Sequence, residues 1–296
     1  MKHLLCTLLF GIFLQGKEIA LSFDDAPMST SKHFETLTRT DMLLKALKEL
    51  QVPPVMIFAN PCKRENSSSV ISQLKKYKDA GHFIGNHTCS HPRLDDVGYT
   101  EYIKDTKKAD DLLFPLFVGQ KFFRFPFLNE GKEEKTRDQM RTWLKENNYR
   151  NGMISIDNDD HIFSFKINQA KERGKKFNYS KVKKLFIEHL ISAVNFYDDL
   201  ALKTLGYSPK HVLLLHEMDA TVMFIRPLIK ELRKQGWKII SIQEAYKDKI
   251  YFEQPKNIYA NNGIIDQMAM EKNGYQVDFN HIDTIKSELN KILGLE

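Results

Sequence analysis

The sequence has only three cysteines, and they lie too far apart to build a zinc ribbon. It also has no internal repeat and no low-complexity linker, so nothing in it indicates a domain boundary before about Lys249. Basic residues exceed acidic ones, 44 to 38, which gives a net charge of +6, but they are scattered and form no concentrated stripe. We therefore expect no nucleic-acid partner.

The apolar run at the N-terminus, Leu4 to Leu14, is too short to cross a membrane as a helix. It follows a basic residue and is typical of the apolar region of a secretory signal. We predict that residues 1–16 are a signal peptide, that the mature chain keeps no stable membrane span, and that the protein is exported by a bacterium, to the periplasm or secreted. The alternatives are a retained anchor or a buried first strand, because Leu14 suits a cleavage site near Gly16 poorly.

Removal of a signal peptide would take Cys6 with it and leave two cysteines, Cys62 and Cys89. In an exported protein such a pair either forms a disulfide or stays free and buried. The sequence by itself leaves both states open, and it predicts no oligomeric state.

Short apolar runs alternate with stretches of helical periodicity along most of the chain. The seven predicted strands are Glu18–Phe23, Val55–Phe58, His82–Gly85, Phe122–Phe125, Gly152–Ile156, His211–Leu215 and Trp237–Ser241. The predicted helices include Asp41–Leu50, Val70–Ala80, Thr100–Phe114, Thr136–Asn147, Val182–Leu200 and Met223–Gln235. This alternation predicts parallel strands with right-handed crossovers, in an open doubly wound sheet or a barrel.

The end of the first strand favours the barrel. An open nucleotide-binding sheet would place a glycine-rich loop there, whereas this strand runs into Asp-Asp-Ala-Pro. We predict an α/β barrel similar to a TIM barrel over residues 17–250. Residues 251–296 contain turn signals and a last amphipathic helix near Ile282–Leu293, and we expect them to pack on the barrel as a C-terminal extension.

Polar side chains gather at the carboxyl ends of the predicted strands, which share one rim in a parallel barrel. The first strand ends at Asp24 and Asp25, the fourth at Arg124 and the sixth at His216. The third ends in Gly-Asn-His-Thr-Cys-Ser-His and the fifth in Asp-Asn-Asp-Asp-His. Finding such groups by chance at five strand ends is much less expected than finding one such group at a single strand end.

His87 and His91 lie four positions apart, so on a single turn both imidazoles could reach one metal ion. Two surface histidines are the alternative. With a carboxylate as third ligand, the set has two imidazoles, one aspartate and a position for water, which is the arrangement of a catalytic zinc. Asp24 and Asp25 are the best-placed suppliers, one to complete the site and the other to act as general base.

Two further strand-end residues fit such a site. Arg124 lies among phenylalanines that would bury it, and a buried guanidinium needs an anionic partner such as the unligated aspartate. His216 follows an apolar strand, where a protonated imidazole can act as general acid if a carboxylate such as Asp157 raises its pKa. A surface arginine and a core histidine are the alternatives.

The ordered set of motifs resembles a known family. The motifs Ser-Phe-Asp-Asp-Ala-Pro, His-Thr-Cys-Ser-His, Arg-Phe-Pro-Phe, Asp-Asn-Asp-Asp-His and Leu-Leu-His occur in the order of the five motifs of the polysaccharide deacetylases, carbohydrate esterase family 4. The resemblance spans roughly Lys17 to Tyr246. It implies a distorted (β/α)7 barrel and metal-dependent removal of N- or O-acetyl groups from the sugars of an acetylated glycan.

The resemblance also implies a role for each carboxylate and ligand. By the family pattern, Asp24 is the base and Arg124 holds it. The implied metal ligands are Asp25, His87 and His91. Such donors accept Zn²⁺, which we expect, and also Co²⁺ or Ni²⁺.

On the opposite side of the implied site, His216 is the acid and Asp157 supports it. Leu214 is implied to line the pocket for the acetyl methyl group. Phe127 stands where the family often has tyrosine, and its backbone amide is implied to contact the oxyanion.

Two other departures from the family pattern bear on the substrate. Ala26 stands where the family usually has glycine, which can change the φ preference of the loop. His161 stands where a tryptophan usually follows the fourth motif, so the wall that shields the acid is more polar. Both departures leave the reaction in place but put the substrate in doubt.

Two alternative functions stay open at this stage. One is hydrolysis of a small amide or imide, against which the signal-like N-terminus argues because such substrates are usually cytoplasmic. The other is an inactive glycan-binding envelope protein, against which the full set of strand-end residues argues. Asn86-His87-Thr88 is a glycosylation sequon beside an implied ligand, which favours bacterial over eukaryotic export.

Overall fold

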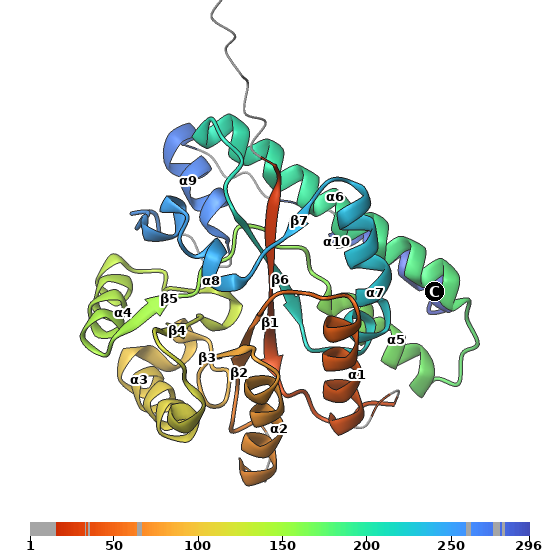
Figure 1. Ribbon diagram of the computed structural model, residues 1–296, viewed down its shortest axis with the longest axis horizontal. Coiled ribbons are helices and arrows are strands. Elements are labelled where there is room, and N and C mark those ends of the chain that lie inside the picture. Colours follow the sequence, from red (N-terminus) through yellow and green to blue (C-terminus); the bar gives the residue numbers. More distant parts are fainter. Residues whose placement is uncertain are drawn as a thin grey trace, which may run out of the picture.

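The computed structural model describes residues 16–32, 34, 36–63, 67–258, 262–274, 279 and 282–296. At its centre one seven-stranded parallel sheet curls into a partial barrel, and helices surround the sheet (Figure 1). This confirms the predicted α/β class and the distorted barrel. Residues 1–15 of the predicted signal peptide lie outside the described part of the chain.

The sheet has the strand order β5-β4-β3-β2-β1-β6, and β7 pairs with the first residues of β1. The strands are β1 (Glu18–Ala26), β2 (Met56–Ala59), β3 (Phe83–Asn86), β4 (Lys121–Phe123), β5 (Tyr149–Asn151), β6 (His211–His216) and β7 (Lys238–Ile239). The α-helices are α1 (Thr36–Glu49), α2 (Ser67–Asp79), α3 (Leu94–Leu113), α4 (Glu134–Glu146), α5 (His161–Glu172), α6 (Tyr179–Leu205), α7 (Asp219–Lys234), α8 (Ile242–Ala245), α9 (Ile264–Asn273) and α10 (Ile282–Leu293). Three short 3-10 helices are η1 (Phe114–Leu116), η2 (Pro126–Leu128) and η3 (Lys249–Phe252).

The central strand β1 sets the register of the sheet. Its residues Ile19 to Asp24 pair in parallel with His211 to His216 of β6, so that Asp24 lies opposite His216. On the other edge Ser22 and Phe23 pair with β2. The end of β1 therefore brings two of the predicted site residues onto neighbouring strands.

The fifth strand begins and ends earlier than the predicted Gly152–Ile156. Tyr149–Asn151 pairs with β4, and the chain then leaves that strand and forms an isolated parallel bridge from Ile156 to Leu213 of β6. The predicted bounds are wrong because the apolar residues after Asn151 cross from one strand of the sheet to another. This crossing curls the sheet, since it joins the β4 side to the β6 side.

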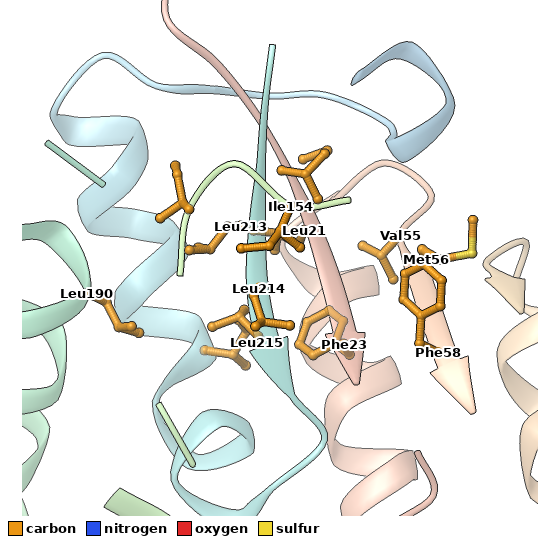
Figure 2. Packing of buried hydrophobic residues seen from close by; sticks show 14 of the residues in the cluster. Leu21, Phe23, Val55, Met56, Phe58, Ile154, Leu190, Leu213, Leu214 and Leu215 are labelled. Carbon is orange, nitrogen blue, oxygen red and sulfur yellow. The ribbon is translucent and has the colours of Figure 1, made fainter. Parts of the chain in front are cut away.

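Apolar side chains of the central strands are buried on both faces of the sheet. Figure 2 shows Leu213 to Leu215 of β6 beside Leu21 and Phe23 of β1, with Phe58 of β2 farther along the sheet. Two glycines make room for the Phe58 ring: a Cβ at Gly85 would lie 2.6 Å from its Cδ1. A Cβ at Gly152 would lie 2.9 Å from its Cε1 and closer still to Cζ.

The C-terminal helices pack on the barrel helices. α9 contacts α6, and α10 contacts α5 and α6. Ile264 and Leu289, from α9 and α10, belong to the same buried apolar cluster as the central strands. The bounds of α10 agree with the predicted last helix. In the described part of the chain, no helix has both the length and the apolar character needed to cross a membrane.

We predict that Gly152→Ala destabilises the fold by about 1–3 kcal/mol, because its new methyl group overlaps the enclosed Phe58 ring. Urea unfolding measures the change in the free energy of unfolding. The double variant Gly152→Ala with Phe58→Leu is the control: removing the ring should relieve the overlap, so the double loss should be smaller than the sum of the single losses. Strict additivity would contradict this account.

Candidate active site

The predicted site residues meet in one cleft of about 460 Å³ at the carboxyl ends of the strands. The cleft is lined by the following predicted residues: Asp24, Asp25, His87, His91, Phe127, Asp157, Leu214 and His216. Arg124 lies beneath them and is 1% exposed. The rim predicted from the strand ends is therefore one continuous site.

Three of these residues turn their donor atoms toward a common point. Oδ1 of Asp25 lies 3.3 Å from Nε2 of His91 and 3.9 Å from Nε2 of His87. All three donor atoms lie within 4.8 Å of one another. Nδ1 of His87 donates to the carbonyl oxygen of Arg124 at 2.8 Å, which leaves Nε2 as the lone-pair donor toward Asp25.

The donor set fits a divalent transition metal. A tetrahedral ion with bonds of 2.0–2.2 Å spaces its ligand atoms by about 3.3–3.6 Å. The Asp25–His91 distance of 3.3 Å lies in this range, and the Asp25–His87 distance of 3.9 Å is slightly longer. Burial would raise the pKa of Asp25, but Lys63 and His91 lower that pKa below its ordinary range, so the carboxylate stays charged. Burial lowers the pKa of His91 to about 4 and lowers the pKa of His87 well below its ordinary value, so both imidazoles are neutral, as metal ligands must be.

Hydrogen bonds shape the loop that carries the two histidines. The side chain of Asn60, just after β2, donates to the carbonyl oxygens of His87 and Thr88. Oδ1 of Asn86 accepts the Thr88 amide, and Oγ1 of Thr88 accepts the His91 amide. Thr88 and His91 have φ values of 65° and 63°, a left-handed conformation that these bonds hold. Asn86 itself is buried, so its sequon is not exposed.

A disulfide joins the same loop to the loop after β2. It links Cys62 to Cys89, whose Cα atoms are 4.8 Å apart, and Cys89 lies between His87 and His91 in the sequence. The amide of Cys62 also donates to the carbonyl oxygen of Cys89 at 2.9 Å. Of the two states that the sequence left open, the structure has the paired one.

Asp24 belongs to a different environment from its neighbour. Nη1 of Arg124 donates to Asp24 Oδ1 at 2.6 Å, while Asp24 Oδ2 lies 3.7 Å from Nε2 of His87. Burial raises the pKa of Asp24 to about 6, although the Arg124 charge opposes the rise. Arg124 in turn donates to the carbonyl oxygen of Gly152 and the hydroxyl of Tyr246. One aspartate thus faces the donor cluster and the other is held beside it.

His216 is held by Asp160, not by Asp157. Its Nδ1 lies 2.6 Å from Asp160 Oδ1, and its amide donates to Asp160 Oδ2 at 2.9 Å. Thr221 donates to the same carboxylate. Burial lowers the pKa of His216, but the Asp160 carboxylate more than offsets this and raises the pKa to about 9.

The supporting role assigned to Asp157 is therefore corrected. Burial, and then the Asp159 charge, raise the pKa of Asp157 to about 7, so it is a poor counter-ion for an imidazolium. Its Oδ1 accepts the Asn158 amide instead. No local signal separates Asp157 from Asp160 within the motif; the start of α5 at His161 brings Asp160 against β6.

Lys63 also lies in this cleft, and sequence reasoning missed it. Its Nζ is 2.8 Å from Asp25 Oδ1. The residue stands outside the five motifs, so no pattern marked it. Its place beside Asp25 follows from the loop that the disulfide holds.

The departures from the family pattern can be placed on the structure. Left-handed backbone occurs at Asp25, with φ 66°, rather than at Ala26, so alanine fits its position. The His161 ring lies 5.4 Å from the His216 ring. Phe127 has φ 59°, is 42% exposed, and contacts His91 edge-to-face with ring centroids 4.6 Å apart.

A second histidine and carboxylate pair lies at the other end of β6 and forms no active site. His211 contacts Ser155 through Nδ1 at 3.0 Å and Asp198 through Nε2 at 3.3 Å. All three side chains are buried, and none lines the cleft. Their resemblance to a serine-hydrolase triad is structural only, because a substrate cannot reach Ser155.

Comparisons with known proteins agree in finding similarity to polysaccharide deacetylases. Residues 14–151 match the family model for polysaccharide deacetylase. A peptidoglycan-N-acetylglucosamine deacetylase of Bacillus cereus is 31% identical over 144 residues, 48% of this chain and 46% of that protein. The chain spans about half the length of the curated relatives it matches.

Solved structures share the fold. A polysaccharide deacetylase from Bacillus cereus has a TM-score of 0.54 at 18% identity, covering 76% of this chain and 91% of that chain. A carbohydrate esterase family 4 pseudoenzyme from Bacillus anthracis has a TM-score of 0.53 at 15% identity, covering 78% and 66%. Because a pseudoenzyme has this fold too, activity has to be argued from the site. The matched segment and the relative show that residues 14–151 are similar to polysaccharide deacetylases, and the solved structures show that the chain shares their fold.

Proposed function

We propose that this protein is a metal-dependent hydrolase that removes acetyl groups, with N-acetyl groups as the expected substrate, from an envelope or extracellular glycan. One observation carries the proposal: a cluster of two histidines and an aspartate shares a cleft with a buried Asp24–Arg124 pair and with His216. These are the parts that amide hydrolysis needs, namely a metal site, a base and an acid.

Asp25, His87 and His91 would hold the metal, for which we propose Zn²⁺, with Co²⁺ or Ni²⁺ as substitutes. When bound, the ion supplies an acidified water and a polarised acetyl carbonyl. Asp24 accepts the proton of the attacking water, and Arg124 keeps its carboxylate turned to that position. The other oxygen of Asp24 already faces His87 at 3.7 Å, so base and ligands border the same space.

His216 supplies the proton that the leaving group needs. Its raised pKa keeps the imidazole protonated at neutral pH, and the bond from Nδ1 to Asp160 leaves the Nε2 proton for transfer. As the carbon–nitrogen bond breaks, this proton goes to the sugar nitrogen, and acetate and a free amine are formed. Asp24 and His216 are paired on the neighbouring strands β1 and β6, so the proposed base and acid border the same part of the cleft.

The walls of the cleft suit an acetylated sugar. Leu214 is 6% exposed and offers an apolar surface to the acetyl methyl group. We propose that the Phe127 amide contacts the developing oxyanion, as the family pattern implies. The exposed rings of Phe127 and Phe165 line the same cleft and can pack on sugar faces, which favours a glycan over a small amide.

We also propose that the protein works outside the cytoplasm. The Cys62–Cys89 disulfide supports this, because disulfides persist in oxidising compartments. The relative in Bacillus cereus bears the name of an enzyme acting on peptidoglycan, an envelope polymer. Fractionation of producing cells, with thiol labelling of the recovered protein, tests the location and the disulfide together.

Released acetate is the direct test of the activity. Acetylated chitooligosaccharides, peptidoglycan fragments and acetylated xylan should be compared, with and without added Zn²⁺. Acetate from at least one glycan, lost on chelation and restored by the metal, is the expected result. Metal binding without acetate from any of the three would instead favour an inactive glycan-binding protein.

For the base, we predict that Asp24→Asn lowers the rate of acetate release by roughly 10²–10⁴-fold, because the amide cannot accept a proton. The variant should still bind one metal ion, since Asp24 is not among the ligands. Asp25→Asn is the matched comparison and should lose metal affinity. An Asp24→Asn enzyme of undiminished rate would remove Asp24 from this role.

For the acid, we predict that Asp160→Asn lowers the pKa of His216 from about 9, because burial is then opposed only by the weaker effects of the Asp25 and Asp24 charges. Asp157→Asn should leave that pKa nearly unchanged. NMR titration of the His216 ring measures both. In the wild type, activity should fall as the pH rises through about 9. In Asp160→Asn, but not in Asp157→Asn, this fall in activity should occur at lower pH.

A further inference from the structure

The side chain of Lys63 contacts the Asp25 oxygen that faces the two histidines. Its Nζ is 2.8 Å from Oδ1 of Asp25, and this same oxygen lies 3.3 Å from the donor nitrogen of His91. The Lys63 side chain is 27% exposed and borders the cleft. The ammonium therefore shares the one carboxylate oxygen that faces both histidines.

The backbone around Lys63 is tied to the ligand loop. Lys63 directly follows Cys62, and the disulfide joins Cys62 to Cys89 between the two histidines. The amide of Cys62 donates to the carbonyl oxygen of Cys89. Lys63 is thus anchored at the same point of the chain that positions the ligands, and its flexible stem reaches Asp25 from there.

The charges that face Lys63 leave Asp25 as its natural partner. Asp24 is engaged by Arg124 at 2.6 Å, and the Arg93 guanidinium lies over the Phe127 ring at 4.1 Å. Among the described residues, Asp25 is the one ion-pair partner that the structure gives Lys63. Without a metal, the ammonium balances the Asp25 carboxylate, which is 8% exposed and would otherwise carry a buried, unpaired charge.

We propose that Lys63 is a tethered ammonium that competes with the divalent metal for Oδ1 of Asp25 and so sets the metal affinity of the site. A metal ion would lie about 2.0–2.2 Å from this oxygen, and the ammonium lies at hydrogen-bond distance from it. Two cations so close together would repel each other. Metal binding therefore requires the ammonium to leave Asp25, and its partial exposure gives it a path into the cleft. The inference rests on the proposed metal site but not on any substrate.

Competition and simple positioning make opposite predictions. If Lys63 only oriented Asp25 for the metal, its removal would weaken metal binding. If it competes, its removal strengthens metal binding and destabilises the metal-free protein, because Asp25 then has no cation beside it. The two effects have opposite signs, so a general loss of structure cannot imitate them.

The experiment uses the full chain with Lys63→Met, which keeps an unbranched side chain only one atom shorter and removes its charge. Zn²⁺ affinity is measured by competition with a chromophoric chelator, and the thermal midpoint is measured with and without metal. We expect Lys63→Met to bind Zn²⁺ at least about tenfold more tightly. We also expect its metal-free midpoint to be lower than that of the wild type.

Two variants control for charge and for surface effects. Lys63→Arg keeps a cation beside Asp25 and should retain affinity close to that of the wild type. Lys76→Met removes an exposed lysine that pairs with Asp41 on the surface and should change neither measurement. If the wild type binds Zn²⁺ and Lys63→Met binds it no more tightly, the proposed competition is wrong but the metal site stands. Absence of Zn²⁺ binding in every variant overturns the metal site itself.

Discussion

The buried ion pair between Arg124 and Asp24 is the interaction on which the rest of the site depends. Both side chains are almost fully buried, and a buried guanidinium without its carboxylate would be strongly destabilising. Arg124 also donates to the carbonyl oxygen of Gly152 and to the hydroxyl of Tyr246, and it stacks on the Phe58 ring at 3.9 Å. One side chain therefore connects four segments of the barrel and fixes the Asp24 carboxylate at their centre.

The two neighbouring aspartates show how backbone direction separates chemical roles. Side chains alternate along β1, and the left-handed φ of Asp25 turns the chain further at that point. Asp24 meets Arg124 in a region where burial dominates, so its pKa rises. Asp25 meets Lys63 and the histidines, so its pKa falls. The same residue type thus provides a base candidate and a ligand candidate one position apart.

A tertiary contact organises the side of the cleft that carries His216. His216 ends β6 and Asp160 precedes α5, and their bond joins a strand to the start of a helix. The fold alone does not settle activity, because a pseudoenzyme of the family shares it. In this chain the base, acid and ligand candidates all line one cleft, with Lys63 among them.

The sequence by itself determined the alternation of strands and helices, and with it the rim where Asp24, His87 and His216 meet. Local periodicity and strand-end position are enough for this, because parallel strands deliver their carboxyl ends to one edge. Only the tertiary structure decided the bounds of β5, the choice of Asp160 over Asp157, and the place of Lys63 beside Asp25. Each of these depends on which distant segments pack together, and neither periodicity nor motif spacing encodes such long-range pairings.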